Sequence, residues 1–276
     1  MRSRPARPRP APEPAPRPSP PPYPADPIQA AGTPEQEWQA WPGFRSLPVL
    51  DPLSRLPAGP GRRPRVLVVA AHPDDEVLGF GGTIALLAAA GIRLRLVSVT
   101  EGEASHPHSD TPVARDLAPV RTRELRQALG RLGADVQAVS LGIPDGRVAR
   151  YEHELTGLLA GQLRDCDLCV APFGQDLHPD HEAAGRAALA AGAARDVPVW
   201  EYPVWAWHWA APGDARLPWH RAARIQLPPG ALARKHAALE CFRSQTRPLG
   251  AGPGDEAILP PAELAHFRRD FETIWR

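Results

Sequence analysis

The feature that most constrains the fold is an alternation of apolar runs and helical segments that begins at residue 65. Five runs are short and continuously apolar, as strands buried on both faces are: 65–72, 93–100, 138–142, 167–173 and 197–204. Helical segments separate them at 79–91, 121–133, 153–164 and 181–193. Strands and helices alternating at this spacing form right-handed βαβ units. We therefore predict an α/β fold, Rossmann-like, with a mainly parallel central sheet of at least five strands flanked by helices.

The chain on either side of this alternation is less regular. Proline makes up roughly half of residues 1–24, and a segment of this composition cannot bury apolar surface. We predict a disordered Pro-rich tail over 1–40 and a single domain over 64–276. Within that domain we expect a core at 64–205 and a C-terminal extension at 206–276 that contains one late helix.

The overall charge narrows the classes of partner. Lysine and arginine number 32 against 31 aspartates and glutamates, giving a net charge of +1, so no basic field points to nucleic acid. The sequence contains no apolar run long enough for a transmembrane helix and no secretory h-region. Three cysteines do not make a disulfide framework. We expect a cytoplasmic protein with no membrane span; its oligomeric state is not indicated.

A first polar cluster, AHPDDE, follows the first apolar run. The carboxyl ends of parallel strands are where α/β sheets place ligands and catalytic groups. Asp74 and Asp75 are adjacent carboxylates that would repel each other unless a cation lies nearby. His72 and Asp75 can converge on one metal ion, which leaves Asp74 to act as a base. The alternative is that one of the aspartates merely caps the next helix.

The glycines after this cluster raise the question of a dinucleotide site. Gly79, Gly81 and Gly82 begin a G-x-G-x-x-G pattern, but position 84 is isoleucine. A nicotinamide-binding domain is therefore not expected.

A second polar cluster, HPDHE, follows the fourth apolar run and opens the fourth helix. His178 and His181 stand three residues apart and can face the same side, although a solvated helix start would look the same. In doubly wound sheets the first strand lies beside the fourth, and the ligand crevice lies between them. The two clusters therefore predict one site, whose histidines and aspartate suit zinc in an open, catalytic arrangement.

Together, AHPDDEVLGFGGT and HPDHEAAG resemble the zinc-dependent PIG-L/LmbE-like de-N-acetylases. This family includes N-acetylglucosaminyl-phosphatidylinositol de-N-acetylase and the mycothiol- and bacillithiol-pathway deacetylases. Three shorter matches support the resemblance: TEGE (100–103), RTRE (121–124) and PDG (144–146).

The resemblance implies a role for each matching site residue. These are the metal ligands His72, Asp75 and His181, the general base Asp74, the catalytic histidine His178, and the sugar contacts Arg121 and Asp145. It implies one Zn²⁺ per chain, although Fe²⁺ also suits such ligands.

The implied reaction is hydrolytic removal of an N-acetyl group from a small amino-sugar compound, with Asp74 accepting a proton from water and a protonated His178 stabilising the oxyanion. The alternatives are a non-catalytic carbohydrate-binding protein of the same fold and an amidohydrolase acting on a non-sugar amide.

Three further features have more than one interpretation. Cys166 and Cys169 have C-x-x-C spacing, yet no second pair accompanies them, and we expect core packing. The loop SHPHSD, which carries His106 and His108, is either solvated or a lid over the site. In WEYPVWAWHW, the alternation of Trp205, Trp207 and Trp209 suits an edge strand or a wall packed against the core; we expect core or wall packing, with a sugar-stacking platform as the alternative.

Overall fold

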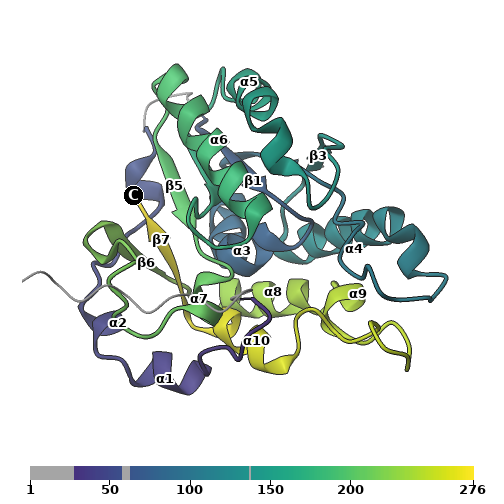
Figure 1. Ribbon diagram of the computed structural model, residues 1–276. Helices are drawn as coiled ribbons and strands as arrows, with labels where there is room; N and C mark the ends of the chain where they lie inside the picture. Colours follow the sequence, from purple (N-terminus) through teal and green to yellow (C-terminus); the bar gives the residue numbers. More distant parts are fainter. Residues whose placement is uncertain (1–27, 58–62, 137) are drawn as a thin grey trace, which may run out of the picture.

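The computed structural model describes residues 28–57, 63–136 and 138–276 of the chain. Within these residues, seven strands form one sheet in the order β3-β2-β1-β4-β5-β7-β6 (Figure 1). The strands are β1 (Arg65–Ala70), β2 (Arg93–Ser98), β3 (Ala138–Ser140), β4 (Leu168–Pro172), β5 (Val199–Tyr202), β6 (Ala222–Gln226) and β7 (Phe271–Trp275).

The first five strands confirm the predicted winding. β1 pairs in parallel with β2 on one side and with β4 on the other, β3 continues from β2, and β5 continues from β4. The direction of winding therefore reverses between β1 and β4, the position at which an open α/β sheet forms its ligand crevice. The C-terminal part of the chain adds β7 and β6 in antiparallel pairings, so the sheet is mixed and mainly parallel.

Helices cover both faces of the sheet (Figure 1). The longer ones are α3 (Asp75–Ala89), α4 (Leu117–Leu132), α5 (Glu152–Gln162), α6 (Pro179–Arg195) and α8 (Pro229–Leu239). The short α-helices are α1 (Glu35–Ala40), α2 (Gly43–Ser46), α7 (Ala206–Trp209), α9 (Arg243–Thr246) and α10 (Pro261–Ala265). Single 3₁₀ turns are η1 (Leu53–Arg55), η2 (Ala114–Asp116), η3 (Val148–Tyr151), η4 (Trp219–Arg221) and η5 (His266–Arg268).

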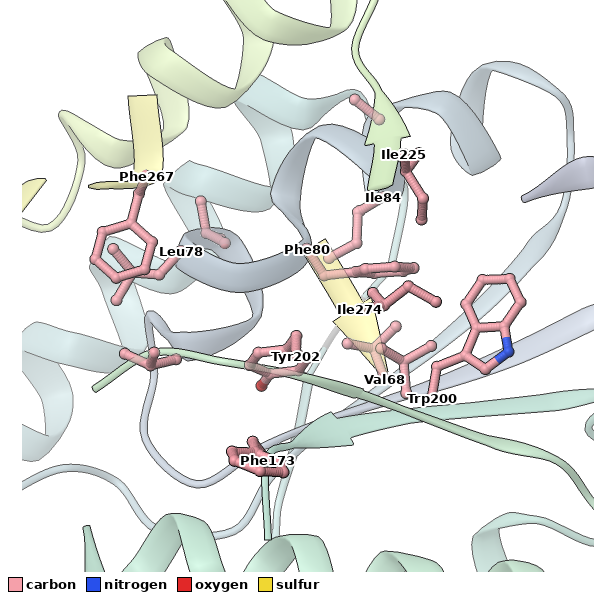
Figure 2. Close-up of a cluster of buried hydrophobic side chains, with 14 of the residues drawn as sticks. Val68, Leu78, Phe80, Ile84, Phe173, Trp200, Tyr202, Ile225, Phe267 and Ile274 are labelled. Atoms are coloured by element: carbon pink, nitrogen blue, oxygen red, sulfur yellow. The ribbon is translucent and has the colours of Figure 1, made fainter. Parts of the chain in front are cut away.

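The two faces of the sheet bury two separate cores. Successive residues of β1 point to opposite faces, so Val66 and Val68 join one cluster while Leu67 and Val69 join the other. The larger cluster contains the aromatic side chains and lies under α3, α4 and α8. Figure 2 shows Phe80 of α3 in this cluster, beside aliphatic side chains from the strands. The smaller cluster is built largely from alanines of α6 and leucines of α5.

Helix α3 begins at Asp75, four residues before the predicted start at residue 79. The apolar pattern starts only at Val77, and the acidic residues Asp75 and Glu76 fill the first turn, where the helix dipole favours negative charge. Because of the earlier start, Asp75 and Glu76 belong to the helix, and the helix backbone sets the direction of their side chains.

A buried polar network holds α3 against the C-terminal strands. The Glu272 carboxylate of β7 accepts hydrogen bonds from the Gly82 and Thr83 backbone N–H groups at 2.7 and 2.9 Å. Lys235, the only lysine of the chain, donates to Glu272 and to the Leu78 carbonyl, each at 2.7 Å. Burial lowers the pKa of the Lys235 amine, although Glu272 acts in the opposite direction. These bonds connect the helix that follows the first motif to α8 and β7.

The segment before β1 is partly folded. The disordered tail was expected to reach residue 40, whereas residues 35–40 form α1; the earlier part of that prediction, over 1–27, lies outside the described residues. Trp38 of α1 is fully buried. Glu35 is buried too, and its carboxylate accepts hydrogen bonds from Arg269 at 2.5 and 2.8 Å and pairs with His266 at 2.6 Å. Aromatic packing and one ion-pair cluster therefore fix α1 to the C-terminal region.

The tryptophan-rich stretch does not form the edge strand that its alternation suggested. Residues 206–209 form helix α7, which begins after Trp205. Trp207 is buried in the larger core, as expected for packing, whereas Trp205 stays partly exposed. Along the described parts of the chain, no helix combines the length and apolar character needed to cross a membrane.

Candidate functional site

The structure brings the two polar motifs together at the reversal point of the sheet. His72 lies two residues after β1, and His178 is the N-cap residue of α6, which follows β4. The Nδ1 atom of His72 lies 3.2 Å from Nε2 of His181, although 109 positions separate the two histidines. The predicted meeting of the first and fourth strand ends is confirmed by this contact.

Asp75 completes a group of three ligand atoms. One of its carboxylate oxygens lies 3.5 Å from His72 Nδ1, and the other lies 3.3 Å from His181 Nε2. Zinc bound tetrahedrally to nitrogen and oxygen at about 2.0–2.1 Å separates its ligand atoms by roughly 3.3 Å. The His72 and His181 nitrogens, 3.2 Å apart, stand at about this distance, and Asp75 approaches each of them with a different carboxylate oxygen.

The remaining nitrogen of each imidazole contacts a carboxylate. His72 Nε2 lies 3.0 Å from Asp145 Oδ1 and 3.4 Å from Asp180 Oδ2. His181 Nδ1 lies 2.8 Å from Asp176 Oδ2. Histidines that bind metal ions donate their second N–H to carboxylates in this way, which fixes the ring orientation and the tautomer. The contacts therefore direct His72 Nδ1 and His181 Nε2 toward one point.

The electrostatics of the group also favour a cation. Burial works against a charged imidazole, yet the carboxylates of Asp145, Asp180 and Asp75 hold the pKa of His72 well above its usual value. Burial likewise opposes the charge on His181, but the neighbouring aspartates raise its pKa to about 9. Carboxylates that stabilise a bound proton also stabilise a metal cation, since both are positive charges. The donor set, the spacing and the charge therefore fit a divalent metal ion.

Asp74 is separate from this group and pairs with Arg121. Its carboxylate lies 3.0 Å from Arg121 Nη2, and no side-chain capping bond to α3 is formed. Asp74 therefore occupies the N-cap position of α3 without a side-chain capping bond. Burial raises the pKa of Asp74 to about 6, while the Arg121 charge acts in the opposite direction. A carboxylate in this range is suited to accept and release a proton near neutral pH.

His178 stands beside the two histidines of the ligand group. Its ring centroid is 4.9 Å from that of His72 and 4.6 Å from that of His181. Its Nδ1 accepts a hydrogen bond from the Asp180 backbone N–H at 3.3 Å, so a neutral ring carries its hydrogen on Nε2. Burial and the nearby histidines lower the pKa of His178 to about 2, which differs from the protonated imidazole expected from the sequence.

Two other combinations of donors are also close enough to bind an ion. His72, His178 and His181 place one nitrogen each within 4.8 Å of one another, and His72 does the same with carboxylate oxygens of Asp145 and Asp180. The roles of Asp75 as ligand and His178 as catalyst, taken from the resemblance, therefore stay predictions.

Arg121 and Asp145 line the same pocket, and their predicted contacts with a sugar stay predictions. Arg121 donates to the Gly102 carbonyl at 2.9 Å and to the Pro73 carbonyl at 3.2 Å, in addition to its pair with Asp74. Asp145 accepts from the Ala104 backbone N–H at 2.8 Å besides its contact with His72. Both side chains therefore have a clear structural role in orienting Asp74 and His72.

Three acidic residues near the site were missed by the sequence reasoning. Asp176, in the segment FGQDL, is fully buried and positions His181. Asp180 lies inside the second motif and accepts from the backbone N–H groups of Gly146 and Val148 at 2.7 and 3.0 Å. Glu76 is buried with no hydrogen-bond partner for its carboxylate among the described residues, and burial raises its pKa to about 8. For Asp180 and Glu76, the only local signal was the acidic character of the motifs that contain them, HPDHE and AHPDDE.

The ligand group opens into a cavity of about 820 Å³. His106 and His108 of the SHPHSD loop line it, His106 buried and His108 exposed. His106 Nε2 contacts the Glu256 carbonyl at 3.2 Å, so this loop is a wall of the pocket rather than a freely solvated segment. Trp205 also lines the cavity. Cys166 and Cys169 lie in the smaller core, as expected.

Comparisons with known proteins identify relatives of this chain. Residues 67–192 match the family described as PIG-L: GlcNAc-PI de-N-acetylase. Two proteins named 1D-myo-inositol 2-acetamido-2-deoxy-alpha-D-glucopyranoside deacetylase are each 31% identical to it. The one from Mycolicibacterium gilvum aligns with 60% of this chain and 66% of its own length, and the one from Mycobacteroides abscessus with 60% and 67%. About a third of each relative thus lies outside the alignment.

A solved structure agrees with the fold. A deacetylase of the teicoplanin biosynthesis pathway is 25% identical and superposes with a TM-score of 0.58, covering 76% of this chain and 96% of its own. The fold and the ligand group define an α/β protein with a His–Asp cluster, suited to a metal ion, at the reversal point of its sheet. The chain belongs to the PIG-L family.

Proposed function

We propose that this protein is a metal-dependent N-deacetylase that hydrolyses the acetamide of a small N-acetylated amino-sugar compound. The observation that carries the proposal is the group formed by His72, Asp75 and His181, which opens into a pocket beside the unliganded carboxylate of Asp74. The deacetylase names of two relatives and of a similar solved structure support the same reaction. A carbohydrate-binding protein would not need a carboxylate poised beside the ligand group.

We propose His72, Asp75 and His181 as the ligands of one zinc ion. A bound zinc ion would supply Lewis-acid polarisation of the acetamide carbonyl and an acidified water. Of the chain's own groups, Asp74 is the base: its carboxylate is buried, lies at the pocket and is held in place by Arg121 at 3.0 Å. Asp74 takes the proton of the attacking water and can return it to the departing amine.

His178 is proposed as a hydrogen-bond donor to the developing oxyanion. Its Nδ1 accepts from the Asp180 N–H, so the Nε2–H of the neutral ring is available to donate. A neutral donor that is already oriented stabilises developing negative charge without a change in its own protonation. This role replaces the protonated imidazole of the sequence-based prediction.

Metal analysis combined with an acetate-release assay tests the proposal. The purified protein should contain one zinc or iron ion per chain and should release acetate from N-acetylglucosamine conjugates. His181→Ala should lose the metal, whereas His178→Ala should keep it and lose at least about 100-fold in turnover. A metal-loaded protein that releases acetate from none of these conjugates would contradict the deacetylase proposal. Loss of metal from His178→Ala would instead assign His178 as a ligand.

A cytoplasmic location remains a prediction from the sequence.

A further inference from the structure

The pocket extends well beyond the ligand group. Its volume of about 820 Å³ lies toward the upper end of the roughly 300–1,000 Å³ used for drug-sized ligands. One side of the pocket continues from His178 through two neighbouring rings: the Trp205 centroid lies 6.5 Å from that of His178, and the His208 centroid lies 5.9 Å from that of Trp205. This side, here called the outer pocket, consists of the lining residues Gln29, Trp205, His208, Ile258 and Glu263. An acetamide bound near the ligand group would leave the outer pocket to the rest of the substrate.

The outer pocket has an apolar side. Trp205 keeps part of its surface exposed there, and Ile258 is likewise only partly buried. Val204, Leu259 and Pro260 continue the same lining. A partly exposed aromatic ring beside aliphatic side chains offers a flat apolar surface for a ring or another apolar face of a ligand.

The charges of the lining disfavour an anionic ligand. Carboxylates of Glu256 and Glu263 line the outer part, and those of Asp74, Asp75 and Asp145 line the inner part. Among the described lining residues, Arg121 is the only arginine or lysine. Its guanidinium already contacts Asp74 and two backbone carbonyls. His208 is charged when both of its ring nitrogens donate, but it is paired with Glu263, whereas Glu256 forms no ion pair with the described residues. A phosphate or carboxylate on the outer part of the substrate would therefore meet the Glu256 carboxylate and no unpaired cationic side chain there.

The wall of the outer pocket is held in a fixed position by His208. Its Nδ1 lies 2.9 Å from Glu263 Oε1 and its Nε2 lies 2.9 Å from the Ala30 carbonyl. Both partners are acceptors, so both ring nitrogens must donate. The hydrogen bond to Glu263 raises the pKa of His208, with burial acting in the opposite direction. Thr33 N–H donates to the His208 carbonyl at 2.8 Å, which ties the N-terminal segment to α7.

Gly32 makes this close approach feasible. A Cβ atom at that position would lie 2.3 Å from His208 Nδ1, closer than atoms can approach without a shift of the backbone or the ring. The outer pocket is therefore built from three segments that meet at His208: residues 28–33, the start of α7, and α10. All three lie outside residues 67–192, the part that matches the family.

We propose that the outer pocket determines substrate specificity by binding the group attached to the amino sugar, and that this group is uncharged with an apolar face. The proposal rests on the deacetylase function proposed above. It assigns Trp205 as a stacking surface, His208 as a positioning residue for the wall, and the Glu256 carboxylate, with no unpaired cation beside it, as the feature that disfavours anionic conjugates.

Three conjugates of N-acetylglucosamine test this specificity on the zinc-loaded full chain. They carry a para-nitrophenyl group, a methyl group, or a phosphate at the anomeric carbon. We expect kcat/KM for the nitrophenyl conjugate to exceed that for the phosphate by at least about tenfold. It should exceed that for the methyl conjugate by about 2- to 10-fold. Equal or faster turnover of the phosphate would overturn the proposal.

Two variants with matched controls locate the effect. Trp205→Ala should raise KM about fivefold for the nitrophenyl conjugate and leave KM for the methyl conjugate unchanged. Trp219→Ala, which removes a partly buried tryptophan outside the pocket lining, should change neither. An equal effect of Trp205→Ala on both conjugates would mean that Trp205 only supports the fold.

Glu256→Lys should improve kcat/KM for the phosphate conjugate by about 2- to 5-fold. The control Glu154→Lys, at an exposed position of α5, should leave kcat/KM for the phosphate conjugate unchanged.

Calorimetry separates this inference from the proposed reaction. The deacetylated nitrophenyl and phosphate conjugates are titrated into the wild-type protein, so that no hydrolysis is required. Absence of acetate release from all three acetylated conjugates would contradict the deacetylase proposal. The outer pocket would still be supported if the nitrophenyl glucosaminide bound at least about tenfold more tightly than the phosphate. Tighter binding of the phosphate, or binding of neither, would overturn it.

Discussion

The inner and outer ends of the pocket reach their geometry by different routes. At the inner end, His72 lies two residues after β1 and His181 lies in the first turn of α6, the helix that follows β4, so the neighbouring strands bring the two within 3.2 Å. At the outer end, residues 28–33, α7 and α10 share no sheet register and meet through contacts of His208 with Ala30 and Glu263. The ligand group is therefore fixed by topology, whereas the outer pocket is fixed by a few polar contacts between distant segments.

Because of this difference, we expect the reaction to depend on the inner end and the choice of substrate to depend on the outer end. Changes at the outer end can alter what the pocket accepts without moving the ligand group, because the sheet holds that group independently. One residue connects the two ends: Asp176 orients His181 and also accepts from the backbone N–H groups of Trp205 and Ala206 at 2.9 and 2.8 Å. Substitutions at either end should therefore act separately, except where they reach Asp176.

The largest effect is expected on folding stability, from α1, which packs against α10, the helix that carries Glu263 of the outer end. Glu35→Gln should lower the free energy of unfolding by about 3–5 kcal/mol, because Arg269 would remain buried without its full counter-charge. Urea unfolding at neutral pH measures this change. Glu37→Gln, exposed on the same helix, is the control. Folded Glu35→Gln protein should still bind its metal ion; loss of metal from folded protein would mean that the two ends are not independent.

The same variant has a predictable pH dependence. Burial raises the pKa of Glu35, but its hydrogen bonds and ion pairs with Arg269 and His266 outweigh burial and leave it below the usual value. A lowered pKa in the folded state stabilises the protein above the unfolded pKa of about 4.3, and the contribution is lost as the pH falls through the folded value. The stability difference between wild type and Glu35→Gln should therefore shrink on acidification below about pH 4.3.

At the inner end, Asp74→Asn should lower kcat at least about 100-fold, because the amide cannot accept the proton of the attacking water. Metal content should stay close to that of the wild type, whereas the unfolding midpoint should fall, because the buried Arg121 loses its counter-charge. Acetate release and elemental analysis on the same preparation check both. Asp135→Asn, at an exposed position outside the pocket lining, should behave as the wild type. Full activity in Asp74→Asn would remove Asp74 from the mechanism.

The connection between the two ends is tested by Asp176→Asn. The variant should bind zinc about 10- to 100-fold more weakly, since His181 loses the carboxylate that fixes its ring. Competition with a chelator measures the affinity. It should also change KM for large conjugates, because the start of α7 loses acceptor strength. Asp196→Asn, at a left-handed position that asparagine tolerates, is the control. Unchanged zinc affinity would show that His181 needs no orienting carboxylate.

The smallest effect is expected for His208→Gln. Loss of one or both wall contacts should raise KM for the nitrophenyl conjugate about 2- to 10-fold, in line with the value of one hydrogen bond. Steady-state kinetics should show kcat unchanged, because the ligand group does not depend on His208. His220→Gln, an exposed histidine, serves as the control. A fall in kcat with no change in KM would place His208 in the inner end instead.

The sequence predicted the parts of this structure that follow from local patterns. Continuous apolar runs identified β1 to β5, and the polar clusters after β1 and β4 identified His72 and His181 as neighbours. The role of Asp176 could not be predicted, since an aspartate in a loop carries no periodic signal. The Glu35–Arg269 pair joins positions 234 residues apart, and such contacts depend on the finished packing. The predicted tail reached residue 40 instead of ending before α1, because the contacts that hold α1 also come from residues far along the chain.

Misleading local patterns account for the remaining differences. The alternation of Trp205, Trp207 and Trp209 suggested an edge strand, yet the segment turns into α7, where Trp207 fills the core and Trp205 faces the pocket. In α3 the prediction followed the glycine-containing apolar stretch and missed the acidic first turn. Tertiary packing and the electrostatics of helix ends decided these two places.

The burial of Lys235 has a practical consequence for labelling the protein. As the only lysine, it is the only source of an ε-amine, and it is 1% exposed within the Glu272 network. Acylating reagents should therefore leave every side-chain amine of the folded protein untouched. Mass spectrometry of intact chains would give the fraction labelled at Lys235 over time. The rate of labelling would then report how often the contact of α8 with α3 and β7 opens in the folded protein.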